Sequence, residues 1–259
     1  MNISYAFGLV FYILSLFVLG LYPKVRILPV PFDASFLFHF FAFFLLYLFL
    51  FDRFKKKATS FFISFLIAGL IELLQWVAPS RSPSLFDFLY DLLGIATALI
   101  IGFKGKETTF KLLYSFFGFG YIPTGPGTLA SLFFAVLIYL SKNLKMIYLW
   151  QIFIILLPIA VIASQKAEDL LTNDPAVCVT DEVIGMAFPL MFLKPDIFLY
   201  LLAFLFFRFF DILKPIGIKR LDKIKGGIGI VLDDLVAGLF ALMVVKMVII
   251  ILSQAGINL

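Results

Sequence analysis

The chain has 259 residues, of which 63% are hydrophobic and 14% are charged, and its mean hydropathy is +1.10. Such a composition excludes an ordinary soluble domain and predicts an integral membrane protein. The formal net charge of +5 does not indicate a nucleic-acid partner, because the basic residues lie in short loops between apolar runs. The single cysteine, Cys178, excludes an internal disulfide.

The first half contains four apolar runs, at about 5–22, 35–51, 58–78 and 85–103. Each run approaches the ~20 residues that a helix needs to span a bilayer. The first run has neither a basic leader nor a small-residue cleavage site, so we expect it to remain as a membrane helix. The polar stretch from Gly102 to Lys111 is the best candidate for a domain boundary, which predicts domains at 1–104 and 105–259.

The second half contains five further runs, at about 129–140, 146–164, 183–193, 197–210 and 235–252. The run at 183–193 is short, and Lys194-Pro195-Asp196 separates it from the next run. These two runs therefore form either two spans or a shallow re-entrant hairpin. The expected fold class is all-α, a polytopic integral membrane protein with about eight or nine membrane helices in two helical bundles.

The distribution of basic residues predicts the orientation of the chain. If the N-terminus is cytoplasmic, thirteen lysines and arginines lie in inner loops and six in outer loops, as the positive-inside rule favours. The loops 112–128, 165–182 and 211–234 then all lie on the cytoplasmic face of an inner (cytoplasmic) membrane. We expect these three loops to converge there.

Two acidic pairs, Asp181-Glu182 and Asp233-Asp234, each stand at the mouth of an apolar run. Carboxylates this close to hydrocarbon are destabilising unless a cation binds them, so they are candidates for a functional site. The chain has one His and one Cys, which leaves mainly oxygen atoms as metal ligands. Oxygen ligands favour a hard cation such as Mg2+.

A loop rich in glycine, Gly-Phe-Gly-Tyr-Ile-Pro-Thr-Gly-Pro-Gly-Thr, occupies residues 118–128. Glycines such as Gly125 and Gly127 expose backbone N–H groups, and Thr128 is expected to cap the following helix, an arrangement that attracts phosphate. The alternative interpretation is an ordinary turn, which loops rich in glycine and proline form more often.

Three charged residues, Arg208, Asp211 and Lys214, recur at every third position before Pro215. This spacing predicts that they share one helical face until the proline ends the helix. They could be only an anchor at the membrane interface. Opposite the two acidic pairs, however, they suit phosphate chemistry: carboxylates hold Mg2+, the cations neutralise phosphoryl oxygens, and a carboxylate activates water.

Two other phosphatase mechanisms fit the sequence less well. A phosphocysteine mechanism needs a thiolate in a loop that carries arginine, and Cys178 has no such surroundings. A histidine-based lipid phosphatase needs at least two histidines, whereas His39 is the only one and lies in the other half of the chain.

Residues from about 112 to 252 resemble the phosphatidylglycerophosphatase A family in three ordered blocks. The blocks are G-F-G-x(3)-T-G-P-G-T at 118–128, D-P-x(5)-D-E-x-x-G at 174–185, and F-R-F-F-D-I-x-K-P at 207–215 continuing to G-G-x-G-I-x-x-D-D at 226–234. The resemblance implies an Mg2+-dependent membrane phosphatase with a cytoplasmic site. Its expected substrate is a phospholipid in the membrane, phosphatidylglycerophosphate, which it converts to phosphatidylglycerol and phosphate.

The resemblance carries the family's site onto the matching positions Asp181, Glu182, Arg208, Asp211, Lys214, Asp233 and Asp234. Our hypothesis is that the two acidic pairs bind the metal and that one of their carboxylates acts as the base. Arg208 and Lys214 would bind the substrate phosphate together with Gly125, Gly127 and Thr128. Asp211 would orient Arg208.

A second polar cluster of unknown role lies in the first half and consists of His39, Glu72, Gln75, Arg81 and Asp87. Glu72 and Gln75 are three residues apart, and Asp87 and Asp91 are four apart, so each pair shares a helical face. Hydrogen bonds between helices would explain the cluster as well as a ligand site would. We expect His39 to be a partner of Glu72 or Asp87, not a metal ligand.

The segment 33–102 is similar to the VanZ-like family, through His39, Glu72-x-x-Gln75, Pro79-x-Arg81, Asp87 and Gly94. One departure is Asp91, which stands where asparagine is usual. We predict an accessory or ligand-binding role outside the membrane for this domain.

Two further functional classes compete with a lipid phosphatase. A membrane transporter would line its path with acids deep in the membrane, whereas the charges of the second half gather at one face. A non-catalytic membrane scaffold would have no need for two intact acidic pairs beside Arg208, Asp211 and Lys214. The sequence therefore favours a phosphoric monoester hydrolase of lipid metabolism.

Overall fold

The computed structural model describes residues 3–22, 35–78, 82–141, 146–171, 175–215 and 224–255. Within these ranges every regular element is a helix, which confirms the all-α class. The physical reason is that hydrocarbon offers no hydrogen-bond partner to a backbone, and a helix satisfies its own N–H and C=O groups. The chain forms two compact units, Leu9–Thr109 and Met1–Gly8 together with Phe110–Leu259.

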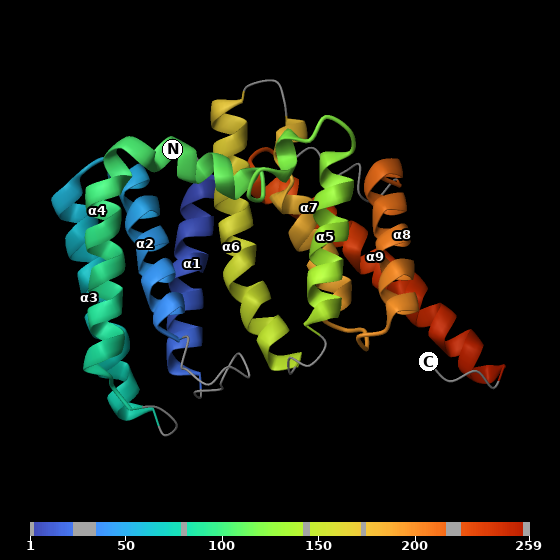
Figure 1. Ribbon diagram of the computed structural model, residues 1–259, viewed down its shortest axis with the longest axis horizontal. Helices are drawn as coiled ribbons and strands as arrows, with labels where there is room; N and C mark the ends of the chain where they lie inside the picture. Colours follow the sequence, from blue (N-terminus) through green and yellow to red (C-terminus); the bar gives the residue numbers. More distant parts are fainter. Residues whose placement is uncertain are drawn as a thin grey trace. The chain divides into compact units, whose positions relative to one another are not determined.

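The first unit is built from four helices: α1 (Ile3–Leu21, from Leu9 onward), α2 (Ser35–Phe54), α3 (Lys57–Val77) and α4 (Leu85–Tyr114, to Thr109). Figure 1 shows these helices in blue to green, with α2 and α3 packed side by side. Helices α2 and α3 are joined by only Lys55 and Lys56, and Lys55 takes a left-handed conformation (φ 57°) in this turn.

Polar and close backbone contacts hold this unit together. The hydroxyl of Tyr12 on α1, which is fully buried, donates to the Ala42 carbonyl of α2 at 2.9 Å. The amide of Gln75 on α3 donates to the Gly20 carbonyl of α1 at 3.0 Å. Gly94 of α4 lies so close to α2 that a Cβ atom there would overlap the Phe40 carbonyl oxygen. The absence of a side chain thus lets α2 and α4 approach each other, as small residues do in membrane bundles.

The second unit contains two short 3₁₀ helices and five α-helices. In chain order they are η1 (Phe119–Tyr121), α5 (Pro126–Leu140), α6 (Met146–Leu170), η2 (Pro175–Val177), α7 (Thr180–Leu190), α8 (Ile197–Leu213) and α9 (Gly227–Gln254). Helix α7 is the centre of the unit, because it packs against α5, α6, α8 and α9. In Figure 1, α9 runs obliquely to α5 and α8.

The contact between α7 and α9 is made by backbone atoms. A Cβ atom on Gly238 of α9 would overlap the Gly185 carbonyl oxygen of α7. A Cβ atom on Gly185 would lie 2.8 Å from both the Cβ atom of Asp234 and a ring carbon of Phe207. Asp234 and Gly238 are four residues apart, so they lie on the same face of α9 and both meet α7 at Gly185.

Several helices extend beyond the apolar runs that predicted them. Helix α4 continues through the polar stretch 102–111, which carries lysine, glutamate and threonine but no proline, and lysine and glutamate are good helix formers. Helix α6 continues to Leu170, six residues past the predicted end. Helix α9 begins at Gly227, so the pair Asp233-Asp234 lies inside it and the prediction that these residues belong to a loop is wrong.

Five helices of the described residues are long and apolar enough to cross a membrane: Ile3–Leu21, Phe36–Phe54, Lys57–Val77, Leu149–Leu170 and Gly227–Gln254. This supports a multi-pass membrane protein, while the predicted count of eight or nine spans stays a prediction. Helix α7 has 11 residues and is only ~16 Å long, about half of the ~30 Å hydrocarbon core. Its length therefore agrees better with the re-entrant alternative than with a full span.

The crossing of α7 and α9 predicts that Gly238→Ala destabilises the protein. The new methyl group must push α9 away from the Gly185 carbonyl, an overpacking effect of about 1–3 kcal/mol. The matched control is Gly69→Ala in α3, where a Cβ atom meets nothing within 4 Å and alanine favours the helix by roughly 0.5–1 kcal/mol. Thermal unfolding in detergent measures both variants, and equal shifts would contradict the close crossing.

Candidate functional site

The N-terminal turn of α7 holds the first acidic pair at the end of α4. The backbone N–H of Val179 donates to the Tyr114 carbonyl at 2.9 Å, and the Thr180 hydroxyl lies 3.1 Å from the same oxygen. Asp181 and Glu182 follow in the first helical turn. Negative charge is favourable there, because the first N–H groups of a helix point toward it. Asp181 is only 8% exposed, so its carboxyl group faces the protein interior.

The second acidic pair, on α9, lies opposite the first. Asp233 and Asp234 are 7% and 4% exposed, and Asp234 packs against α7 at Gly185. The carboxyl group of Asp234 lies in the electrostatic field of the other carboxylates of the site, namely Asp181, Glu182, Asp211 and Asp233. The predicted convergence of 165–182 with 211–234 is therefore present in the second unit, although it is made by helices and not by loops.

Helix α8 brings a guanidinium group to the same place. Arg208 Nη1 lies 2.7 Å from Asp211 Oδ2, one helical turn further along α8, and 3.8 Å from Glu182 Oε1 of α7. The contact with Asp211 is an ion pair without hydrogen-bond alignment, since Arg208 Nη1 and Nε have no hydrogen-bond partner. The guanidinium group thus retains buried donors that are not satisfied by the protein.

Lys214 departs from the predicted helical face. Helix α8 ends at Leu213, and Lys214 follows in a left-handed conformation (φ 41°, ψ 67°). The local reason is Pro215, because a proline disfavours the α-helical conformation of the residue before it. The ammonium group of Lys214 forms an ion pair with Asp233 Oδ2 of α9. The prediction of one continuous face for Arg208, Asp211 and Lys214 is therefore wrong for Lys214, which instead joins α8 to α9.

The glycine-rich loop reaches the acidic residues through Gly127. A Cβ atom on Gly127 would overlap Glu182 Oε1, so the start of α5 lies directly against this carboxyl group. Helix α5 begins at Pro126, with Gly125 as the N-cap in a left-handed conformation (φ 58°). Thr128 lies inside the helix, and the prediction that it caps α5 is wrong. The reason is that proline, with its preset φ, favours the first helical position.

Burial and mutual repulsion raise the pKa values of the acidic pair on α7. Desolvation, together with the nearby Asp233 carboxylate, raises the pKa of Asp181 to about 7. Desolvation and the Asp181 carboxylate raise the pKa of Glu182 well above its ordinary value, and Arg208 opposes this shift only in part. The described residues of the site include five carboxyl groups and two cations, so the site favours a further positive charge.

The chemistry of the donors fits a hard cation. Asp181 Oδ1 and Glu182 Oε2 are buried oxygen atoms without a hydrogen-bond partner, and oxygen is the ligand atom that Mg2+ prefers. In the described ranges, no three His, Cys, Asp or Glu side chains are arranged closely enough to hold a metal ion. The structure thus supplies the ligand type and the excess charge but not a coordination geometry.

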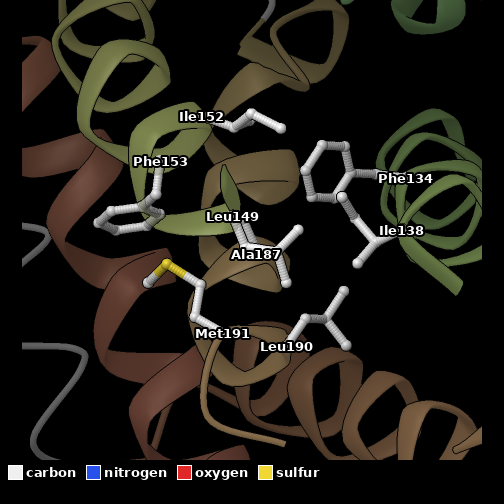
Figure 2. Close-up of a pocket in the computed structure, with 8 residues that line it drawn as sticks. All are labelled: Phe134, Ile138, Leu149, Ile152, Phe153, Ala187, Leu190 and Met191. Carbon is white, nitrogen blue, oxygen red and sulfur yellow. The ribbon is translucent and has the colours of Figure 1, made fainter. Parts of the chain in front are cut away.

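Two other features of the unit lie apart from the chemistry of the site. Burial raises the pKa of the Cys178 thiol, whose sulfur lies 3.5 Å from the Ser164 hydroxyl oxygen, so this cysteine is not an activated thiolate. Figure 2 shows an apolar pocket between α5, α6 and α7 that includes Phe134, Phe153 and Leu190. Leu190 is nine residues beyond Asp181, about 13 Å along α7, so the pocket does not contain the acidic pair.

The polar cluster of the first unit is centred on His39. His39 Nδ1 lies 2.8 Å from Asp91 Oδ1, whereas His39 Nε2 lies 3.8 Å from Asp87 Oδ2. The prediction that Asp87 is a partner of His39 is therefore confirmed, but the shorter contact is with Asp91, which is fully buried one turn beyond Asp87. Glu72 Oε2 instead accepts from the Ser84 N–H at 2.7 Å.

Some predicted residues cannot be placed. Arg81 of the polar cluster and Asp174 of the second sequence block lie outside the described residues. Three placed contacts were missed by sequence reasoning: the pair Lys214–Asp233, the approach of Gly127 to Glu182, and the pair His39–Asp91. The pair His39–Asp91 could have been predicted from the acid at position 91, because a buried carboxylate requires a partner.

The comparisons with known proteins match the two units. Residues 112–249 match the family model of phosphatidylglycerophosphatase A, and residues 14–104 match that of VanZ/LLP1. Phosphatidylglycerophosphatase A of Escherichia coli is 36% identical over 132 residues, which cover 48% of this chain and 74% of the relative. The protein of the same name from Haemophilus influenzae is 34% identical over 133 residues, covering 50% and 82%.

A third relative carries a different name. A Bacteroides thetaiotaomicron protein provisionally named phosphatidylinositol-3-phosphatase is 33% identical over 137 residues, which cover 50% of this chain and 86% of the relative. No solved structure matches the chain.

The geometry of the polar cluster predicts that His39 is coupled more strongly to Asp91 than to Asp87. The change Asp91→Asn removes the charge at 2.8 Å, and a buried pair in contact has a coupling energy of about 0.5–3 kcal/mol. Double-mutant cycles of His39→Gln with Asp91→Asn and with Asp87→Asn, followed by thermal unfolding, measure both couplings. A larger coupling to Asp87 would refute the assigned pairing.

Proposed function

The chain belongs to the phosphatidylglycerophosphatase A family, and we propose that it hydrolyses phosphatidylglycerophosphate to phosphatidylglycerol and inorganic phosphate. The family and its named members support a lipid phosphatase. The structural observation that carries the proposal is the meeting of four helix ends in one unit. They bring Gly127 of α5, the acids of α7 and α9, and Arg208 of α8 to one place.

The proposed mechanism uses the unsatisfied atoms of this site. Arg208 donates to the phosphoryl oxygens through Nε and Nη1, which have no hydrogen-bond partner in the protein, and Asp211 holds its guanidinium group. The first amides of α5, at Gly127 and Thr128, lack intrahelical partners and favour an anion in front of the helix. Lys214, at the joint between α8 and α9, supplies a second positive charge.

We further propose Mg2+ as the cofactor, held by Asp181, Glu182, Asp233 and Asp234. A bound Mg2+ would neutralise the charge that develops on the phosphoryl group. One of these carboxylates takes a proton from water as the oxygen attacks phosphorus, and the bond from phosphorus to the headgroup oxygen breaks. The protonated carboxyl group then gives that proton to the leaving headgroup oxygen, so that phosphate and the dephosphorylated lipid are formed and the carboxylate is restored.

The proposal also names one phospholipid headgroup as the substrate. The relative from Bacteroides thetaiotaomicron is provisionally named for phosphatidylinositol 3-phosphate, so a phosphorylated inositol lipid is the second candidate substrate. Both substrates share a phosphate monoester on a phospholipid headgroup. The residues of the site are proposed to bind this phosphate monoester, which both lipids share.

The location of the site follows from charge and helix order. We propose that the chain lies in the inner (cytoplasmic) membrane with the site facing the cytoplasm, because the basic residues favour this orientation. The starts of α5, α7 and α9 and the end of α8 then lie at the cytoplasmic face. The VanZ-like unit is proposed to be an accessory domain, whose buried pair His39–Asp91 contributes to its stability.

Purified protein is expected to release phosphate from phosphatidylglycerophosphate only when Mg2+ is present. The reason is that two cations cannot balance five carboxyl groups and a phosphate in one site. Released inorganic phosphate is measured with and without EDTA, with phosphatidylinositol 3-phosphate as the parallel substrate. Release that is unaffected by EDTA would refute the metal, and release from neither lipid would refute the proposed function.

The variant Asp233→Asn is expected to lose activity by at least about 100-fold, because it removes a proposed metal ligand and the charge that holds Lys214. The matched control is Asp196→Asn. Asp196 caps α8 by accepting from the Leu199 N–H at 3.1 Å, and asparagine caps helices equally well. Phosphate release per mole of folded protein is compared. Near-normal turnover of Asp233→Asn would disprove the assignment.

A further inference from the structure

The N-terminal end of α9 is pressed against α6 by two glycines. Gly226 precedes the helix with φ 90°, a conformation that other residues rarely adopt. A Cβ atom on Gly227, the first helical residue, would overlap the Val161 carbonyl oxygen and lie 2.7 Å from the Gln165 backbone nitrogen. The backbones of α6 and α9 are therefore in direct contact at this joint, with no room for a side chain.

A buried glutamine connects the two helices across the joint. The Gln165 side chain is fully buried, and its Oε1 accepts from the Gly227 N–H at 3.0 Å. This N–H belongs to the first turn of α9 and has no partner within the helix. The Nε2 group of Gln165 donates to Glu168 Oε2 and Asp169 Oδ1, each at 3.0 Å. Both ends of the side-chain amide are thus used, and only an amide supplies this combination of acceptor and donors.

The first turn of the chain packs onto the same joint. Residues 1–8 belong to the same compact unit as Gln165, and a Cβ atom on Gly226 would overlap the Ser4 hydroxyl oxygen and lie 2.6 Å from Gln165 Oε1. Lys166, next to Gln165, places its ammonium group 5.1 Å from the ring centre of Tyr5. Contacts from α1 and α6 therefore surround the start of α9.

The position of this joint determines the position of the acidic pair. Asp233 and Asp234 follow Gly227 by less than two turns, which is about 9–10 Å along α9. At the joint and at the crossing at Gly238, the backbone of α9 is in direct contact with the backbones of α6 and α7, and these two contacts oppose sliding or rotation of the segment between them. A change at the joint is therefore transmitted to the carboxyl groups.

We propose that Gln165 is a positioning residue for the phosphatase reaction: it fixes the start of α9 against α6 and thereby sets Asp233 and Asp234 opposite the acidic pair of α7. The inference rests on the proposed function only for its kinetic consequence. Its structural consequence, the register of α9 against α6, can be measured without any activity.

The kinetic test compares Gln165→Met, which has a similar length but no amide, with Gln165→Glu, which still accepts from the Gly227 N–H but cannot donate to Glu168 and Asp169. We expect Gln165→Met to lower kcat by about 10-fold or more with little change in KM, because misplaced catalytic groups affect the transition state most. Gln165→Glu is expected to be intermediate. The control is Gln151→Met, on the same helix and about 21 Å away along its axis.

The structural test places spin labels at two exposed positions, Leu170 on α6 and Leu239 on α9, in a Cys178→Ser background. Gln165→Met is expected to shift or broaden the distance distribution between them, and Gln151→Met is not. If Gln165→Met keeps a kcat per folded molecule within about 2-fold of that of the parent protein and leaves the distance distribution unchanged, Gln165 only stabilises the protein and does not position the acidic pair. An unchanged distribution alone overturns the proposal, even if the parent protein releases no phosphate from either lipid.

Discussion

The backbone contact between α7 and α9 is the constraint on which the second unit depends. Gly185 and Gly238 allow the two helices to cross without intervening side chains, and Asp234 lies beside that crossing. Two carboxyl pairs on different helices can approach each other only if the backbones that carry them are close. The same small residues that permit tight packing in the absence of a hydrophobic driving force between helices therefore also assemble the site.

This assembly leaves the site with an excess of negative charge. Arg208 and Lys214 form ion pairs with Asp211 and Asp233, yet Asp181 Oδ1 and Glu182 Oε2 still have no hydrogen-bond partner. Burial disfavours the charged form of a carboxyl group, and it raises the pKa of Asp181 to about 7. Under the proposed function, Mg2+ and the substrate phosphate would offset this unfavourable arrangement.

The two units use buried polar groups in different ways. In the first unit the carboxylate of Asp91 meets the imidazole of His39 at 2.8 Å, and Gln75 bonds to the backbone of α1. These contacts connect helices. In the second unit Gln165 has such a connecting role, whereas Arg208 retains donors that the protein does not satisfy. Buried side-chain atoms without a hydrogen-bond partner occur in both units, for example Asp91 Oδ2 in the first and Glu182 Oε2 in the second, so it is the family relation that points to the second unit as the place of the chemistry.

The sequence alone determined the fold class and the residue types of the site. Apolar runs of spanning length have to become helices in hydrocarbon, and a chain with one His and one Cys can offer a metal little but oxygen. The end of α8 just before Pro215 was also predicted from the sequence. Only the tertiary structure decided that Lys214 meets Asp233, that His39 meets Asp91, and that Gln165 holds α9. Such pairings depend on the rotation and register of packed helices, which are set by contacts between residues far apart in the sequence.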